Sequence, residues 1–123
     1  MTPFGAKLRQ LRAERGVTLK AMAEALAVTP TYLSALEHGK RGVPTWFMVQ
    51  RIIAYFNVIW DEAEELQRLA EMSDPRVVID TAGLDPQATE LANLLAVKIH
   101  GLSKASLTDL IHRLRVAAAK DKV

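Results

Sequence analysis

The sequence predicts an all-α protein with five helices over residues 4 to 72, then a linker or short strand, then a C-terminal pair of helices. Three observations predict this fold class. Apolar residues recur at helical spacing in successive segments, and residues that favour helix ends flank those segments. Half of the 123 residues are hydrophobic, which excludes a disordered chain and is enough to bury one core.

The first two helices are predicted from apolar residues between charged ones. Phe4, Leu8 and Leu11 recur at helical spacing, and Gly16 suits the end of that helix. Thr18 is suited to cap the second helix. The inward face of the second helix is expected to hold Leu19, Met22, Ala23 and Leu26.

The third helix has a clear signal at each end. Thr29 suits the cap, Pro30 the first turn and Gly39 the residue after the end. Leu33 and Leu36 should face inward. The fourth helix should run from near Pro44 to about Phe56, and the fifth should follow Asp61, with an inward face formed by Leu66 and Leu69.

The character of the chain changes after Met72. Two Asp-Pro turn signals and the β-branched residues 77 to 79 predict a linker or a short strand. A helix should then run from Asp85-Pro86 to about His100, and Ser103 should cap a last helix. The sequence therefore predicts two parts, residues 1–72 and residues 73–123. The apolar stripe of the last helix comprises Leu107, Leu110, Ile111 and Leu114.

The charge distribution is more informative than the net charge of +2. Residues 1 to 42 carry seven Lys or Arg against three Glu, a net +4, whereas residues 43 to 74 carry two basic against six acidic residues, a net −4. A basic first third predicts that one end of the molecule meets a polyanion. The absence of cysteine excludes a disulfide framework and a cysteine zinc site, and it favours a cytoplasmic location.

Residues 42 to 60 form the most apolar stretch, with Arg51 as its one charge. Pro44, Gln50 and Asn57 interrupt the stretch, whereas a spanning helix needs about 20 continuous apolar residues. A buried helix is therefore predicted, and no membrane contact. The aromatic residues of this region are expected to lie mainly in the core; they are Trp46, Phe47, Tyr55, Phe56 and Trp60.

Residues 18 to 41 fit two short helices joined by a three-to-four-residue turn, the helix-turn-helix arrangement. The first helix needs a small residue where the second crosses it, and Ala23 occupies that place. Apolar residues must close the angle between the helices. The packing residues are predicted to be Met22, Ala23, Leu26, Val28, Leu33 and Leu36.

The segment TLKAMAEALAVTPTYLSALEHGKRG resembles the helix-turn-helix of phage repressors, the XRE family typified by the lambda and 434 repressors. The resemblance covers residues 4 to about 72, and its strongest marker is the run from Tyr32 to Gly39, which in that family is the recognition helix. Two residues depart from the family pattern. Ala27 stands where Gly is usual in the turn, at a cost of about 1 kcal/mol if φ must be positive. Leu19 stands where a phosphate-contacting Gln is frequent.

The resemblance implies that the third helix enters the major groove of DNA with its N-terminal residues toward the bases. The candidate base contacts are Thr29, Thr31, Tyr32, Ala35 and His38. None makes the bidentate pairing that Arg makes with guanine, so DNA shape should carry part of the specificity. The candidate phosphate contacts are Thr18, Lys20, Lys40 and Arg41; for Lys40 and Arg41, a role at the helix C-terminus, against its dipole, is compatible.

These features predict a sequence-specific, double-stranded-DNA-binding transcriptional regulator, a repressor that acts as a dimer. The stripe at Leu107, Leu110, Ile111 and Leu114 is the predicted interface with an identical or related chain. The alternative is an antitoxin-like or other interaction module whose C-terminal helices hold a partner protein. No enzyme, cofactor or metal site is predicted, because the sequence shows no nucleophile with a base, metal cluster or phosphate loop. No pattern indicates a small-molecule effector.

Overall fold

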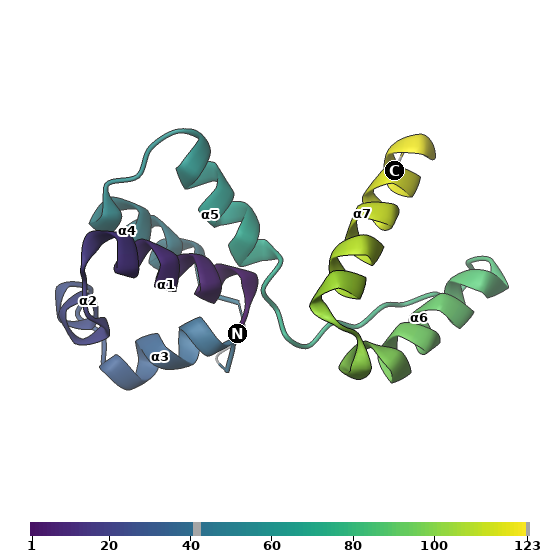
Figure 1. The fold of residues 1–123 in the computed structure, drawn as a ribbon, viewed down its shortest axis with the longest axis horizontal. Helices are drawn as coiled ribbons and strands as arrows, with labels where there is room; N and C mark the ends of the chain where they lie inside the picture. Colours follow the sequence, from purple (N-terminus) through teal and green to yellow (C-terminus); the bar gives the residue numbers. More distant parts are fainter. Residues whose placement is uncertain (41–42, 123) are drawn as a thin grey trace. The chain divides into compact units, whose positions relative to one another are not determined.

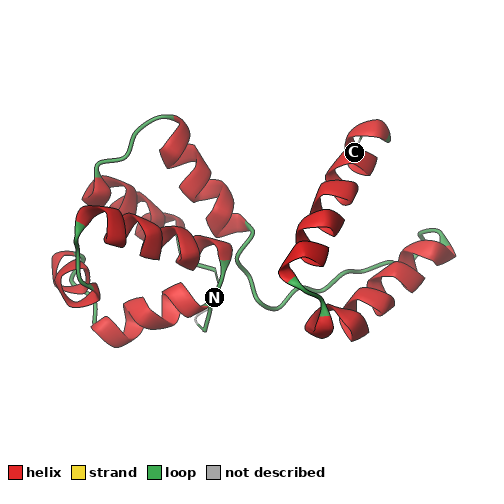
Figure 2. Ribbon diagram, viewed as in Figure 1, coloured by secondary structure: helices red, strands yellow, loops and turns green. Residues whose placement is uncertain are grey.

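The computed structural model describes residues 1–40 and 43–122. Over these residues the chain is all-α, as predicted, and it divides into two compact units, Met1–Val77 and Val78–Val123. We call them the N-terminal unit and the C-terminal unit. Figure 2 shows helices joined by loops, with no strand among the described residues.

The N-terminal unit contains the five predicted helices. They are α1 (Pro3–Arg15), α2 (Leu19–Ala25), α3 (Pro30–His38), α4 (Trp46–Phe56) and α5 (Asp61–Glu71). Figure 1 shows α1 between α3 and α5; it packs against both, while α2 packs on α3 and α4 packs on α5. The fourth helix begins at Trp46 rather than near Pro44, because the hydroxyl of Thr45 caps it by accepting from the Met48 amide at 3.2 Å.

One core holds these five helices together. Every apolar residue predicted to face inward from the first three helices is buried or half-buried in it. The buried members are Phe4, Leu8, Leu11, Met22, Ala23, Leu26, Leu33, Leu36, Met48, Val49, Ile52, Phe56, Val58, Leu66 and Ala70. Leu19, Val28 and Leu69 are half-buried against this core.

The expectation that the aromatic residues lie mainly in the core is wrong for three of the five. Phe56 is buried and Tyr55 is half-buried, but Trp46, Phe47 and Trp60 are 65%, 74% and 80% exposed. α4 buries a single face, formed by Met48, Val49, Ile52 and Phe56, and its first turn lies beyond that face. Trp60 precedes α5 at φ 54° and has no place on the buried face of either helix.

Ser73 joins the end of α5 to the start of α1. Its side chain is buried and accepts a hydrogen bond from the Phe4 amide at 3.0 Å, while its hydroxyl donates to the Leu69 carbonyl. The amide of Phe4 belongs to the first turn of α1, where no intrahelical acceptor is available. Ser73, which lies just after α5, therefore connects the end of α5 to the start of α1 by hydrogen bonds.

The C-terminal unit consists of α6 (Pro86–Lys98), the short 3₁₀ helix η1 (Ile99–Gly101) and α7 (Lys104–Lys120). Asp85 and Ser103 cap the two α-helices as predicted, accepting from the amides of Gln87 at 2.8 Å and Ser106 at 3.1 Å. No residue in 78–122 is buried. The C-terminal unit thus has helices but no core of its own.

The alternative of a short strand at residues 77 to 79 is wrong, and this segment is a loop. A strand needs a neighbouring strand to accept and donate its backbone hydrogen bonds, and Val78 is instead 94% exposed. A turn lies on each side of residues 77 to 79. The Asp74 side chain accepts from the Arg76 amide before the segment, and the Asp80 side chain accepts from the Ala82 amide after it, each at 2.9 Å.

Candidate nucleic-acid interface

The turn between α2 and α3 has the form that the helix-turn-helix motif requires. Leu26 follows α2 as its C-cap, and Ala27 then adopts φ 57°, the left-handed conformation that glycine enters without strain. The Val28 amide donates to the Ala23 carbonyl at 3.0 Å, which closes the helix end. The departure from glycine at this position therefore places an alanine at a positive φ.

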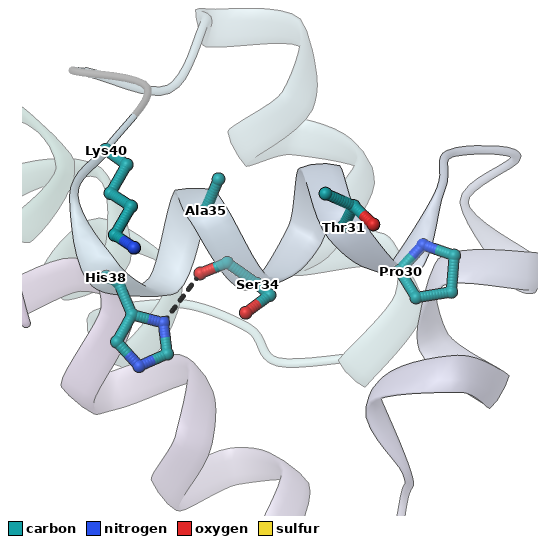
Figure 3. A pocket seen from close by; sticks show the side chains of 6 residues that line it. All are labelled: Pro30, Thr31, Ser34, Ala35, His38 and Lys40. Atoms are coloured by element: carbon teal, nitrogen blue, oxygen red, sulfur yellow. Dashed lines mark hydrogen bonds between the residues drawn. The ribbon is translucent and has the colours of Figure 1, made fainter.

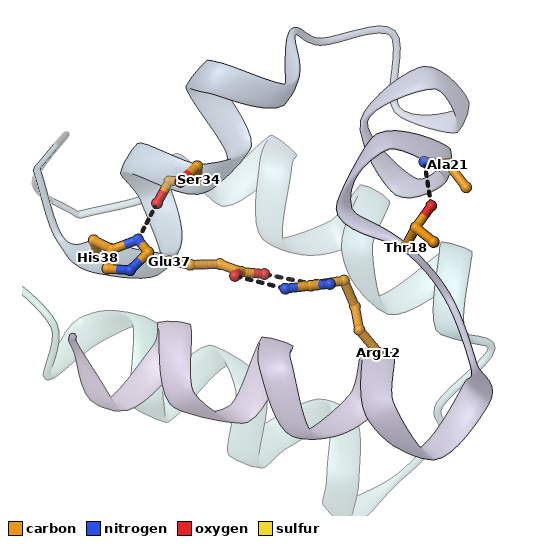
Figure 4. Close-up of polar contacts among 6 residues, drawn as sticks. All are labelled: Arg12, Thr18, Ala21, Ser34, Glu37 and His38. Atoms are coloured by element: carbon orange, nitrogen blue, oxygen red, sulfur yellow. Dashed lines mark hydrogen bonds and ion pairs between the residues drawn. The ribbon is translucent and has the colours of Figure 1, made fainter.

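The inner face of α3 is fixed by apolar and charged contacts. Leu33 and Leu36 are fully buried, and Glu37 beside them is only 2% exposed. The Arg12 guanidinium donates two hydrogen bonds of 2.9 Å to the two carboxylate oxygens of Glu37 (Figure 4). Gly5 lets α1 approach, since a Cβ there would lie 1.7 Å from the Glu37 carbonyl oxygen. Sequence reasoning missed this contact because no local pattern pairs residues 25 positions apart.

The outer face of α3 presents an open depression of about 400 Å³ (Figure 3). Its lining residues are Pro30, Thr31, Ser34, Ala35, His38 and Lys40. Of the candidate base contacts, Thr29, Thr31 and His38 are exposed, while Tyr32 and Ala35 are half-buried. The structure therefore brings Thr31, Ala35 and His38 to one surface, and it packs part of Tyr32 against the core.

Two of the candidate threonines also have a structural role. The hydroxyl oxygen of Thr18 accepts from the Ala21 amide, and that of Thr29 accepts from the Tyr32 amide, both at 3.0 Å. The Thr18 cap is drawn in Figure 4. Each hydroxyl retains a proton that it can donate to a phosphate or a base. These residues therefore shape the two helix ends whether or not they also contact DNA.

The basic first third is less available to a ligand than its sequence suggests. Arg12 is paired with Glu37, Arg15 donates to the Phe56 carbonyl at 2.6 Å, and Lys7 lies 3.8 Å from a Glu62 oxygen. Lys20 and Lys40 are exposed at the start of α2 and the end of α3. Arg41, the fourth candidate phosphate contact, lies outside the described residues.

The predicted dimer stripe lies on α7 and is largely exposed. Leu107 is half-buried, whereas Leu110, Ile111 and Leu114 are 42%, 50% and 65% exposed. Within the described ranges, no three His, Asp or Glu side chains gather as metal ligands would. Neither α4 nor any other helix of residues 1–40 and 43–122 has the length and hydropathy needed to cross a bilayer.

Matches to known proteins range from the N-terminal unit alone to almost the whole chain. The family model described as helix-turn-helix domain matches residues 3–69. The HTH-type transcriptional regulator RamB of Mycobacterium tuberculosis is 29% identical over 123 residues, which cover 97% of this chain and 25% of RamB. No solved structure matches the chain.

Two other relatives carry opposite regulatory names. The HTH-type transcriptional activator BcrR of Enterococcus faecalis is 41% identical over 71 residues, 55% of this chain and 34% of BcrR. The HTH-type transcriptional repressor RghR of Bacillus subtilis is 46% identical over 44 residues, 36% of this chain and 33% of RghR. The chain thus spans between a quarter and about a third of the length of these three relatives. Since the family match covers more than half of the chain, the chain belongs to the helix-turn-helix domain family, of the XRE type.

Proposed function

We propose that this chain is a sequence-specific regulator of transcription that places α3 in the major groove of duplex DNA. One observation carries the proposal. The inner face of α3 is locked by Leu33, Leu36 and the Glu37–Arg12 pair, so its outer face is a rigid, exposed surface with Lys40 at its end. A rigid helix presented in this way is what base readout needs.

Direct contacts to bases are proposed for the exposed end and flank of α3. Thr31 offers a hydroxyl and a methyl group, Thr29 a hydroxyl, and Ala35 an apolar contact to a thymine methyl. Tyr32 reaches the groove with the part that is not packed on the core. Since none of these side chains forms a bidentate pair with a base, DNA shape and deformability contribute to specificity.

Contacts to phosphates are proposed for Thr18, Lys20, Lys40 and Arg41. Lys20 and Lys40 are exposed and take part in no ion pair among the described residues. Each lysine that neutralises a phosphate releases counterions, so it contributes to affinity for any duplex and to its salt dependence.

We propose a repressor, because a helix-turn-helix bound at a promoter can block transcription by occupancy alone, and because the matched relative RghR carries that name. The regulator would act in the cytoplasm, where its duplex ligand lies. It would need no cofactor or metal and would have no enzymatic activity.

We further propose that residues 1–72 bind DNA and that residues 73–123 form a linker and a dimer interface. No residue in 78–122 is buried, although the C-terminal unit has apolar side chains on both α6 and α7. Covering these side chains with the same unit of a second copy would supply the missing core, and two-fold pairing suits a two-fold operator. The stripe at Leu107, Leu110, Ile111 and Leu114 would lie in this interface.

The same observation supports a second candidate, in which the C-terminal helices hold an unlike partner protein, as an antitoxin-like subunit does. The two candidates differ in stoichiometry. Sedimentation of the purified chain as a dimer at micromolar concentration supports the first. A monomer that copurifies with another protein, and loses it when residues 73–123 are removed, supports the second.

The test of DNA binding is a salt titration. Duplexes selected from a random pool are compared with scrambled duplexes of equal length, for the full chain and for Lys40→Ala. We expect a preference of at least about a thousandfold for the selected duplex. Lys40→Ala should weaken binding to both duplexes and lower the slope of log K against log salt by about one per bound chain.

Arg68→Ala is the matched control, since Arg68 is an exposed cation of α5 far along the chain from the motif. This variant should leave the slope unchanged. Binding that is independent of salt, or equal for selected and scrambled duplexes, would contradict the proposed function.

A further inference from the structure

His38 ends α3, and its ring makes a hydrogen-bonding contact with the backbone of the preceding turn. The side chain is exposed, lines the depression together with Lys40, and has its Nδ1 2.8 Å from the carbonyl oxygen of Ser34 (Figure 3). A carbonyl oxygen can only accept a hydrogen bond, so Nδ1 must carry the hydrogen. The other nitrogen, Nε2, therefore has a bare lone pair when the ring is neutral and an N–H when the ring is protonated.

This arrangement decides what His38 can bind. A phosphate oxygen offers only acceptors, so it cannot bond to the bare Nε2 of the neutral ring. It can accept a charge-assisted hydrogen bond from Nε2–H of the imidazolium. We infer that His38 contacts a DNA backbone phosphate through Nε2 as the imidazolium, so that each chain takes up a proton when it binds duplex. This inference rests on the proposed function and reassigns His38 from base contact to phosphate contact.

The position of His38 favours a phosphate over a base. In this docking mode the N-terminal residues of the recognition helix approach the base edges, and His38 lies at the opposite end of α3. Lys40, another candidate phosphate ligand, lines the same end of the depression. A base would be read differently, because neutral Nε2 would accept from the amino group of adenine or cytosine and no proton would be taken up.

Among the residues that the structure describes, no charged side chain of the neighbouring helices pairs with His38. Glu37, the adjacent residue, turns inward and is paired with Arg12. The helices that pack most extensively on α3 are α1 and α2, and within the described residues none of their charged groups is hydrogen-bonded or ion-paired with His38. Those groups are Lys7, Arg9, Arg12, Glu14 and Arg15 of α1 and Lys20 and Glu24 of α2.

Lys40 supplies a positive charge at the same depression. A phosphate placed there would attract both Lys40 and the imidazolium of His38. Proton uptake by His38 should therefore accompany duplex binding.

The experiment measures affinity against pH. The full chain is titrated with its selected duplex from about pH 8 to about pH 6, the range in which histidine changes charge, at constant ionic strength. We expect the association constant of the wild-type chain to rise by up to about tenfold per chain for each unit that the pH falls. His38→Gln should remove this rise, and His38→Arg should bind as tightly at pH 8 as the wild type does at pH 6.

Control variants separate His38 from other groups that titrate. His38→Gln retains the amino terminus and both other histidines, so its difference from the wild type isolates His38. His100→Gln and His112→Gln, in the C-terminal unit, should keep the full pH dependence. A long-range ¹H–¹⁵N spectrum of the free protein at pH 8 should show the hydrogen of His38 on Nδ1.

The outcomes are distinct. A pH dependence that persists in His38→Gln, or a wild-type affinity that is flat with pH while salt dependence and duplex preference are intact, would overturn the inference and leave the proposed function standing. Loss of preference for the selected duplex at every pH would instead overturn the proposed function.

Discussion

Arg12 of α1 and Glu37 of α3 form a bidentate ion pair inside the N-terminal unit, Nε to Oε2 and Nη2 to Oε1, both at 2.9 Å. The side chain of Glu37 is 2% exposed and that of Arg12 is 17% exposed. The two parallel hydrogen bonds require the planar guanidinium and the carboxylate to lie in one plane. Together with the buried Leu33 and Leu36, the pair therefore fixes which side of α3 faces inward and which residues it presents outward.

Removing the arginine alone should be costly. In Arg12→Met the Glu37 carboxylate stays buried without its partner, and we expect the free energy of unfolding to fall by about 3 kcal/mol. The double variant Arg12→Met/Glu37→Leu removes both charges and should recover most of that loss. Urea unfolding of the three proteins measures both effects. A double variant no more stable than Arg12→Met would show that the pair contributes more than the avoidance of a buried, unpaired charge.

Gly5 sets the distance at which α1 and α3 pack. A Cβ at residue 5 would lie 1.7 Å from the carbonyl oxygen of Glu37, which is backbone and cannot turn aside. Gly5→Ala should therefore push the two helices apart and lower the free energy of unfolding by about 3 kcal/mol. Gly101→Ala is the matched control, because nothing lies within 4 Å of its Cβ position and its φ is not positive. Equal thermal midpoints for the two variants would contradict the predicted packing.

The helices and the motif could be predicted from the sequence because their signals are local. Thr18, Thr29 and Ser103 precede their helices as caps, and the amides they bind lie three residues ahead. Leu33 and Leu36 face inward because helical spacing places them on one side. Such features depend on a few neighbouring residues, which the sequence displays directly.

The contacts between helices could not be predicted, because nothing local identifies the partner. Ser73 accepts from the amide of Phe4 across 69 positions, and Arg12 meets Glu37 across 25. The one available signal was that Glu37 shares the inward face of α3 with Leu33 and Leu36, where a carboxylate needs a cation. The aromatic residues were placed wrongly for a related reason: composition gives apolar content, and only packing decides which apolar side chains the core can hold.

The turn of the helix-turn-helix motif should be strained at Ala27. Its φ of 57° is unfavourable for a residue with a Cβ, so Ala27→Gly should raise the free energy of unfolding by about 0.5 to 1 kcal/mol. The same substitution at Ala54, exposed within α4, should lower it by about 1 kcal/mol. Chemical denaturation compares the two, and a loss of stability in both variants would show that the turn is not strained.

The C-terminal unit offers a test of the proposed dimer. Leu110 lies in the apolar stripe of α7 and is 42% exposed, and a carboxylate there would be buried without a partner if a second copy covered the stripe. Leu110→Glu should shift the chain to monomer in sedimentation equilibrium at micromolar concentration. His112→Glu is the control, since residue 112 lies on the opposite side of α7 from the stripe and should leave the assembly unchanged.

The two variants should also differ on DNA. A dimer gains affinity for two half-sites through the linkage of its DNA-binding units, so Leu110→Glu should weaken binding to a palindromic duplex by about a hundredfold or more. Binding to a single half-site should change less than about twofold, because the N-terminal unit has its own core and does not contain residue 110. An unchanged affinity for the palindrome, or a wild-type chain that sediments as a monomer, would exclude α7 as the dimer interface.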